Sequence, residues 1–422
     1  MVRGALRPFA VLLVFLALAC SDNGSDGTSS QAPAVPGTSA ARDAAPDPER
    51  ILEHVRQLSV EIGPRAAGTA GEAEAADYLA GTLRSFGYEV EVEPFNVTSE
   101  SSRPASLRLT NPGREISALV IGGSASATVG GWVVDAGIGR PGDFPEGTRG
   151  AIALMERGEL LFGEKVTNAV TAGAAAVIVY NNQPGQFFGT LGNEATVPAI
   201  AITREDGEAL RRDLAAGDVE AEVMAGPAGS LSSANVVARP PDRDCETVTG
   251  GHYDSIVGPG ASDNATGAAV VLELAQVIAE RGQLAAICFI LFGEEEGLHG
   301  SRAYVEGLDG AARERMRLMI NLDMVGVGDE TWLFIGDPEY QRRLEAIAAD
   351  LGIEGRSGGL PDNASSDHAP FRDAGIPAVM LHRTDDPLLH TPEDVFERVD
   401  PENLGAAARL SLALLLSVTN ES

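Results

Sequence analysis

The sequence predicts an α/β protein in which helices flank a mixed central sheet and a smaller inserted domain interrupts the chain. The first observation is a set of apolar segments separated by helical patterns: Glu246–Gly251, Ala285–Phe292, Met319–Met324 and Ala378–Leu381. Ala285–Phe292 is apolar at every position, which is typical of a strand buried on both faces of a sheet. The second observation is a change of character between residues 103 and 230, where short strands and Gly-rich turns replace this pattern.

Charge and composition exclude several classes of function. The chain of 422 residues has 31 Lys and Arg against 61 Asp and Glu, a net charge of −30. Such a surface repels phosphate backbones, so we expect no binding to nucleic acid. Lys165 is the only lysine, and Val166 follows it where a P-loop needs Ser or Thr, which argues against P-loop phosphate chemistry.

The N-terminus has the pattern of an export signal. Arg3 and Arg7 precede the apolar run Phe9–Ala19, which is too short to span a bilayer. The run ends in Leu16-Ala17-Leu18-Ala19-Cys20, which resembles a bacterial lipobox. We therefore expect residues 1–19 to be a signal peptide and Cys20 to carry a lipid anchor to the membrane. An ordinary cleaved signal peptide and a secreted protein are the alternative.

The segment after Cys20 predicts a tether. Residues 20–47 are mainly Ser, Gly, Asp, Ala and Pro with almost no large apolar side chain. Such a tether would hold a folded body away from the cell envelope. The remaining cysteines, Cys245 and Cys288, are either a disulfide, which export permits, or separate thiols with Cys288 buried in its strand.

The segments that precede the change of character belong to the main domain. Helical spacing covers Glu49–Leu58 and Gly71–Phe86, and Tyr88–Val97 alternates as a strand does. The apolar strands return after residue 230. We therefore expect residues 48–102 and 231–422 to form the main domain and residues 103–230 to form the insertion.

The inserted segment resembles the protease-associated (PA) domain. Its order of elements is strand, turn, helix over Lys165–Ala176, and strand over Val177–Asn181. The matching words are Arg149-Gly150-Ala151-Ile152-Ala153-Leu154, Glu156-Arg157-Gly158, Lys165-Val166-Thr167-Asn168-Ala169, Ala172-Gly173-Ala174, Val177-Ile178-Val179-Tyr180-Asn181-Asn182 and Val197-Pro198-Ala199-Ile200. The resemblance implies a lid or a role in substrate access, without catalytic groups of its own.

Acids and histidines lie at or near the ends of the predicted strands of the main domain. They are His252 with Asp254, Asp263, the adjacent Glu294 and Glu295, Asp323, and His390. Ligands of open α/β sheets bind at such strand ends. Each residue alone has a structural explanation, but adjacent acids after a buried strand are costly without a cation. Imidazole and carboxylate ligands without a thiolate suit zinc.

Through these acidic and histidine motifs, the chain resembles the co-catalytic zinc aminopeptidases of metallopeptidase family 28, whose domain has the zinc exopeptidase fold. Glu61-Ile62-Gly63-Pro64-Arg65 and Gly68-Thr69 match the opening of that family as well. The resemblance implies two Zn²⁺ per chain and gives each site residue a role. His252 and Asp323 would hold one zinc, Glu295 and His390 the other, Asp263 would bridge them, and Glu294 would be the general base.

The resemblance also implies supporting residues and one departure. Asp254 would orient His252, His368 would support the site, and the bond between Asp263 and Asn264 would be cis. Many relatives have a tyrosine ahead of the last histidine, where this chain has Leu388 and Leu389. His368 and Tyr304 are our candidates for its replacement.

The expected function is a secreted or lipid-anchored zinc aminopeptidase that removes N-terminal residues from peptides. A carboxypeptidase or dipeptidase on the same site is the alternative, because Arg372 and Arg383 lie near the metal motifs. A receptor-like relative without activity should have lost the metal ligands, which this chain retains. No motif in the sequence favours a glutaminyl cyclase over a peptidase. Gly355-Arg356-Ser357-Gly358-Gly359 fits GxSxG, but a loop follows it where a serine hydrolase needs a helix. Calcium binding by the acidic loops stays open.

Overall fold

The computed structural model describes residues 44–99, 102–111, 113–282, 286–328, 331–360, 364–384 and 386–419. The predicted signal peptide, Cys20 and nearly all of the predicted tether lie outside these residues. Of the helices that are described, none is both long and apolar enough to cross a membrane.

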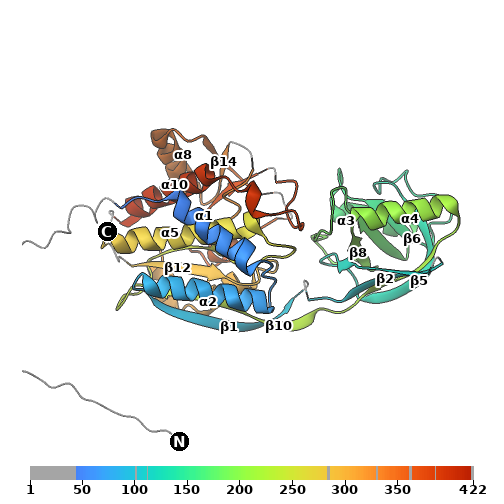
Figure 1. Cartoon of the computed structure of the whole chain (residues 1–422), viewed down its shortest axis with the longest axis horizontal. Coiled ribbons are helices and arrows are strands. Elements are labelled where there is room, and N and C mark those ends of the chain that lie inside the picture. The colour runs from blue at the N-terminus through green and yellow to red at the C-terminus, as the bar shows by residue number, and fades with distance from the viewer. Residues whose placement is uncertain are drawn as a thin grey trace, which may run out of the picture.

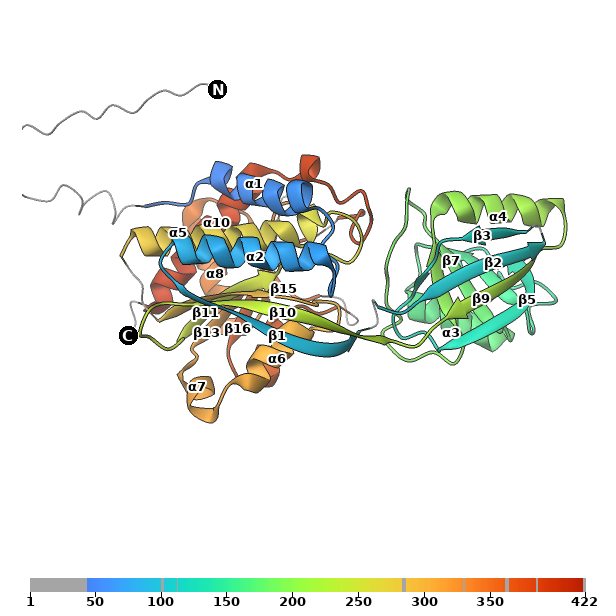
Figure 2. The ribbon, with the colours of Figure 1, turned by 60° about the horizontal axis from the view of Figure 1, so that its bottom comes forward.

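The structure has two bodies, each built on an eight-stranded sheet, with two long strands running from the first toward the second (Figures 1 and 2). The first sheet is mixed, as predicted, with its four central strands β12, β11, β13 and β16 parallel. Its spatial order is β1 (Glu89–Ser99), β10 (Gly229–Arg239), β12 (Ile287–Phe292), β11 (Thr247–His252), β13 (Leu318–Leu322), β16 (Ala378–Arg383), β14 (Trp332–Gly336) and β15 (Gly355–Gly358).

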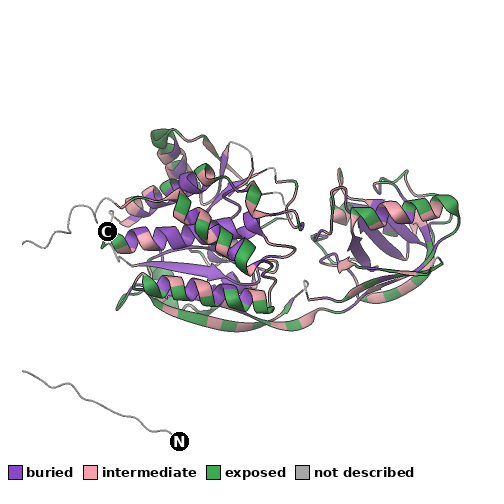
Figure 3. Ribbon diagram, viewed as in Figure 1, coloured by how far each residue is buried: buried purple, intermediate pink, exposed green. Residues whose placement is uncertain are grey.

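Helices cover both faces of this first sheet. The helices of one face are α1 (Pro48–Arg56), α2 (Ala70–Ser85), α5 (Thr266–Glu280), α8 (Pro338–Leu351) and α10 (Pro401–Thr419). Those of the other face are α6 (His299–Gly307), α7 (Gly310–Arg315) and α9 (His368–Asp373). In Figure 2 the first group lies above the sheet, and α6 and α7 lie below it. Strand β12 alternates between the two cores: Phe289 and Leu291 face one, and Ile290 and Phe292 the other. The strand is therefore buried on both faces, as its continuous apolar run predicts (Figure 3).

The second body contains the predicted insertion. Its sheet has the order β3 (Arg114–Ile116), β2 (Ala105–Asn111), β9 (Glu220–Ala225), β5 (Ala127–Asp135), β6 (Ile152–Glu156), β7 (Ala176–Tyr180), β8 (Ala199–Ile202) and β4 (Leu119–Val120). Its helices are α3 (Phe162–Ala172) and α4 (Arg204–Ala216), which contribute to separate cores on the two sides of the sheet. The helix expected over Lys165–Ala176 was placed too late, because Gly173 adopts φ 91° and ends it.

The two bodies are joined where β1 ends and β10 begins. Strands β1 and β10 pair over their whole length, from Glu89 opposite Arg239 to Ser99 opposite Gly229. The chain leaves the first sheet after Ser99 and re-enters it at Gly229. The insertion is thus attached through a single antiparallel pair, visible as the long strands between the bodies in Figure 2.

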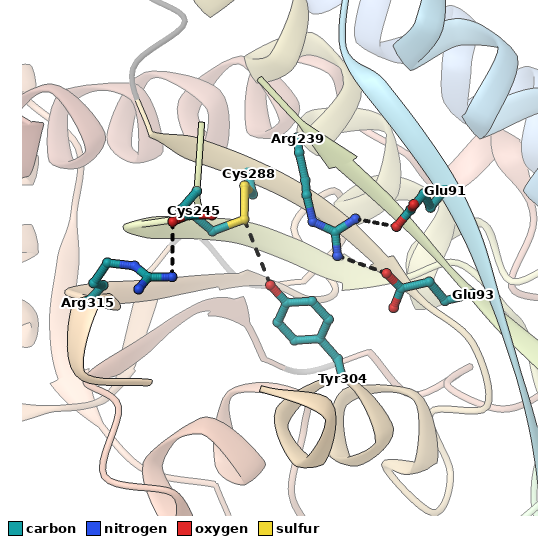
Figure 4. Close-up of a disulfide and its surroundings, with 8 residues drawn as sticks. Glu91, Glu93, Arg239, Cys245, Cys288, Tyr304 and Arg315 are labelled. Carbon is teal, nitrogen blue, oxygen red and sulfur yellow. Dashed lines mark hydrogen bonds and ion pairs between the residues drawn. A yellow bond between two sulfur atoms is a disulfide. The ribbon is translucent and has the colours of Figure 1, made fainter. Parts of the chain in front are cut away.

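Cys245 and Cys288 form a disulfide, which settles the two alternatives that the sequence left open. The bond links the segment before β11 to β12, with the two Cα atoms 5.5 Å apart. Figure 4 shows the hydroxyl of Tyr304 pointing toward the sulfur of Cys245, 4.0 Å away, and the guanidinium of Arg239 between Glu91 and Glu93. A disulfide agrees with the exported protein that the N-terminal sequence predicts.

Candidate metal centre and catalytic site

The parallel strands bring the predicted site residues to one edge of the first sheet. His252 is the last residue of β11 and pairs with Phe292, the last residue of β12. Glu294 and Glu295 follow β12 directly, and Asp323 follows the end of the neighbouring strand β13. Because parallel strands end at the same edge, residues far apart in the sequence meet there.

Asp263 lies between the two histidines. Its Oδ1 is 3.1 Å from Nε2 of His252, and its Oδ2 is 3.0 Å from Nε2 of His390. Oδ1 of Asp323 lies 3.6 Å from the same nitrogen of His252. One carboxylate thus faces one imidazole with each oxygen, which is the arrangement expected of a bridging ligand.

Glu295 lies beside His252 and Asp323 in this cluster. Ligand atoms of His252, Glu295 and Asp323 all lie within 4.8 Å of one another. The family resemblance groups Glu295 with His390 at the second zinc. Since Asp263 contacts both histidines, Glu295 borders the shared centre of the cluster.

The site is electrostatically suited to a cation. Burial disfavours the charged form of His252, but its contacts with Asp254, Asp263 and Asp323 outweigh burial and raise its pKa well above the usual value. Burial opposes ionisation of Asp263 too, yet the two histidines lower its pKa. Burial raises the pKa of Glu295 well above its usual range. Buried acids that stabilise a positive charge at this point fit a bound metal.

Unpartnered buried atoms support the same conclusion. Among the described residues, both ring nitrogens of His252, Oδ1 of Asp323 and Oε2 of Glu294 are buried and accept or donate no hydrogen bond. Leaving such atoms unsatisfied is costly, and ligation would satisfy Nε2 of His252 and Oδ1 of Asp323. Imidazole nitrogens and carboxylate oxygens without a thiolate are a donor set that zinc accepts, so the residues fit zinc.

Other residues hold these candidate ligands in place, and Asp254 is one that the sequence analysis named. Its Oδ1 lies 3.4 Å from Nδ1 of His252, and its Oδ2 accepts from the backbone N–H of Glu295 at 3.3 Å. Asp254 therefore contacts two candidate ligands at once, which suits the orienting role expected of it.

Sequence reasoning missed two supporting residues. The carboxylate of Asp394 accepts from the backbone N–H groups of Ser262 and Asp263 at 2.7 and 3.0 Å. Ser366 donates to Oδ2 of Asp323 at 2.7 Å. Asp394 lies four positions after His390, and Ser366 lies two positions before His368.

The turn that carries Asp263 has the backbone expected of it. The peptide bond between Asp263 and Asn264 is cis. Nδ2 of Asn264 donates to the carbonyl of Leu322 at 2.9 Å, and its Oδ1 accepts from the N–H groups of Gly267 and Met324. These contacts fasten the turn to the end of β13.

Arg65 fixes the loop that leads to Asp263. The side chain is fully buried and donates to the carbonyls of Tyr253, Leu58, Gly63, Pro259 and Gly260 at 2.6 to 2.9 Å. Burial lowers its pKa to about 10, a value that leaves the guanidinium charged at neutral pH. The Glu-Ile-Gly-Pro-Arg motif therefore places a buried cation against the loop that carries Asp263.

Neither candidate for the missing tyrosine lines the cavity at the site. The Tyr304 ring packs with Phe292 and Phe371 in the core and its hydroxyl points toward the disulfide, so that assignment is wrong. His368 begins α9 and is buried, but it is not among the residues that line the cavity. His382 does line it, and Nδ1 of His382 lies 3.0 Å from the carbonyl of Asp323.

The cavity lies between the two bodies and has a volume of about 980 Å³. The first body contributes Asp263, Glu294, Glu295, Asp323 and His390 to its lining, and the inserted body contributes Gly122, Arg157, Phe162, Phe188 and Thr190. The ring centroids of Phe188 and His390 lie 6.3 Å apart, edge to face, and the backbone N–H of Phe188 donates to the carbonyl of His390. The inserted body thus forms one wall of the site.

The fold and this site define a metal-dependent hydrolase of the zinc exopeptidase type. Residues 235–415 match the model of peptidase family M28, and residues 119–210 match that of the PA domain. The chain is 36% identical over 385 residues to aminopeptidase YwaD of Bacillus subtilis, covering 85% of this chain and 82% of that one. The chain belongs to peptidase family M28 and carries a PA domain within it.

Two further relatives agree with this assignment. The structure of BSAP, a zinc aminopeptidase from Bacillus subtilis, superposes with a TM-score of 0.75 at 31% identity, covering 89% of this chain and 96% of that one. The probable lipoprotein aminopeptidase LpqL of Mycobacterium tuberculosis is 30% identical over 378 residues, 84% of this chain and 74% of LpqL.

Proposed function

We propose that this protein is a zinc aminopeptidase that hydrolyses the first peptide bond of peptides. The observation that carries the proposal is the cluster of Asp263 between His252 and His390, with Asp323 and Glu295 beside it, at the wall of a cavity large enough for a peptide end. The family and the named relatives support zinc as the metal and aminopeptidase as the activity.

We assign two zinc ions to the site. His252 and Asp323 would hold one, His390 and Glu295 the other, and Asp263 would bridge them. Zinc bound there supplies Lewis-acid activation of a water and of the scissile carbonyl. Asp263→Ala should lower the affinity for both ions, because Asp263 contacts both histidines. Elemental analysis of the reconstituted protein would count them, and a content of only trace zinc would contradict the assignment.

Glu294 is the general base of this proposal. It takes the proton of the attacking water and passes it to the leaving amine. Glu294 is 1% exposed and lines the cavity, and burial raises the pKa of its carboxyl to about 7. A buried carboxyl that lines the cavity is placed to take a proton from a water and pass it to the leaving amine.

One peptide in three forms tests the activity. We expect cleavage of the peptide with both ends free, no cleavage after N-acetylation, and little change after C-amidation. The opposite pattern would indicate a carboxypeptidase. Arg383 and Arg157 line the cavity and could bind the free carboxylate that such an enzyme must recognise. Arg372, the other arginine considered from the sequence, is not among the lining residues. Cleavage of all three forms would indicate an endopeptidase.

We also propose export and a lipid anchor at Cys20. The lipobox-like sequence and the name of the lipoprotein relative LpqL support it. Cys20→Ser should release the protein into a soluble fraction or block its processing. Membrane attachment that survives this substitution would exclude Cys20 as the anchor.

A further inference from the structure

We propose that Ser99 is a positioning residue that orients the general base Glu294, and that it does so from the strand that leads into the inserted domain. The inference rests on the proposed function, in which Glu294 is the base. Ser99 Oγ donates a hydrogen bond to Oε1 of Glu294, and the two residues are 0% and 1% exposed. They are 195 positions apart in the sequence.

The two oxygens of Glu294 have different surroundings. Oε1 is held by Ser99, whereas Oε2 is buried without a hydrogen-bond partner among the described residues. Nε2 of His299 is 3.8 Å from Oε2, and both His299 and Glu294 line the cavity. Fixing one oxygen turns the carboxylate so that the other is left for a substrate water. A base needs this orientation within hydrogen-bond reach of the proton that it takes.

The backbone before Glu294 packs against the same pair of strands. A Cβ atom added to Gly293 would lie 2.3 Å from Oγ of Ser233 and 2.6 Å from the carbonyl of Ala234, both on β10. Only glycine fits this close approach. Strands β1 and β10 therefore hold the base from two directions, one through its carboxylate and one through its backbone.

These contacts lie where the chain passes between the two bodies. Ser99 is the last residue of β1 and pairs with Gly229, the first residue of β10. The hydroxyl of Ser102 closes the junction: it donates to the carbonyl of Ser99 at 2.7 Å and accepts from the backbone N–H of Gly229 at 2.9 Å. A displacement of the inserted domain would move this junction, and Ser99 would transmit the movement to the base.

Ser99→Ala tests the contact. We expect kcat to fall about 10- to 100-fold, since hydrogen bonds to charged groups are of this strength, while KM and zinc content stay unchanged. Ser99→Thr keeps the hydroxyl and should restore most of kcat. Ser230→Ala is the matched control, because Ser230 is exposed on the partner strand β10. An unchanged kcat in Ser99→Ala, or a loss of zinc along with activity, would overturn the proposal.

A double-mutant cycle shows whether Ser99 acts through Glu294. In the Glu294→Gln background, Ser99→Ala should lower kcat less than about twofold, because the base is already lost. Effects that multiply would show that Ser99 acts independently and would overturn the inference. A parent protein that cleaves none of the three peptide forms would instead contradict the proposed function, so the two failures can be told apart.

Ser102→Ala tests the junction without touching the base. We expect a smaller fall in kcat, about two- to fivefold, that also disappears in the Glu294→Gln background. A kcat equal to that of the parent would refute the link between the junction and the base.

Discussion

At the scale of single residues, Glu294 and Glu295 are adjacent acids with different surroundings. Ligand atoms of Glu295 lie within 4.8 Å of those of His252 and Asp323, whereas Oε1 of Glu294 accepts from Ser99 and its Oε2 is unpartnered. The difference arises at the turn after β12, where Glu294 adopts φ 53°. The two adjacent side chains therefore have different contacts, which suits Glu295 to metal binding and Glu294 to proton transfer.

The first prediction follows from this division. Glu294→Gln keeps the size of the side chain and removes its capacity to accept a proton. We expect zinc content to stay at the parental level and kcat to fall by about 10²- to 10⁴-fold. Metal analysis alongside steady-state kinetics checks both quantities. If zinc is lost together with activity, Glu294 is a ligand and its role has been exchanged with that of Glu295.

The candidate metal ligands could be predicted from the sequence, whereas most of the residues that hold them in place could not. His252, Asp263, Asp323 and His390 could be chosen because each lies in a short word at or near a strand end, and the structure brings all four together. Ser99 and Asp394 could not be assigned their contacts in this way. A serine or acid that supports a ligand across a long sequence separation has no local pattern, so only the folded chain reveals it.

At the scale of secondary structure, strand positions followed from apolar runs, while boundaries were set by backbone geometry. The fully buried β12 was recognised because every residue of Ile287–Phe292 is apolar. The end of α3 was missed because Gly173 can either continue a helix weakly or end it, and its φ of 91° ends it. Strand β1 pairs with β10, and even the nearest partners, Ser99 and Gly229, are 130 residues apart in the sequence. This pairing forms only if the inserted domain brings the chain back to the end of β1.

The second prediction concerns helix α1 and the pH dependence of stability. His54 contacts the hydroxyl of Tyr78 on α2, and burial, followed by the charge of Arg50, lowers its pKa from 6.5 to about 4. The folded protein thus keeps His54 neutral where the unfolded chain takes up a proton. This contribution to stability is fully present above pH 6.5 and is lost as the pH falls toward 4.

Urea unfolding of the zinc-free protein between pH 4.5 and 7.5 measures this effect. His54→Gln cannot titrate, so its free energy of unfolding should fall less on acidification, by no more than about 3 kcal/mol over the window. Tyr78→Phe is the control: it removes the hydroxyl but leaves His54 covered, so its pH dependence should remain. Parallel curves for His54→Gln and the parent would rule out His54 as the source.

At the scale of the whole molecule, the site is assembled from both bodies. The first body supplies the candidate ligands and the base, and the inserted body closes the cavity with Phe188, Phe162 and Arg157. Each body could be recognised from its own sequence motifs. No motif indicates which face of one body packs toward the other. The contact between Phe188 and His390 joins them at the site itself.

The last prediction tests whether this wall takes part in binding. Phe188 is 6% exposed, and its ring lies beside that of His390 on a lining that also includes Ile256 and Leu389. Phe188→Ala removes apolar surface that a substrate side chain would cover. We expect KM to rise about tenfold for a substrate with an N-terminal leucine and less for one with an N-terminal alanine, because the smaller side chain covers less of the wall.

The matched control for this variant is Trp132→Ala. Trp132 is 54% exposed on β5 of the same inserted body and is not among the residues that line the cavity, so its removal should leave both KM values unchanged. Equal rises in KM for leucine and alanine substrates would mean that Phe188 acts on His390 rather than on the substrate side chain, and zinc content would then fall as well. If Phe188→Ala matches the parent in KM, kcat and zinc content, the Phe188 ring takes no part in substrate binding.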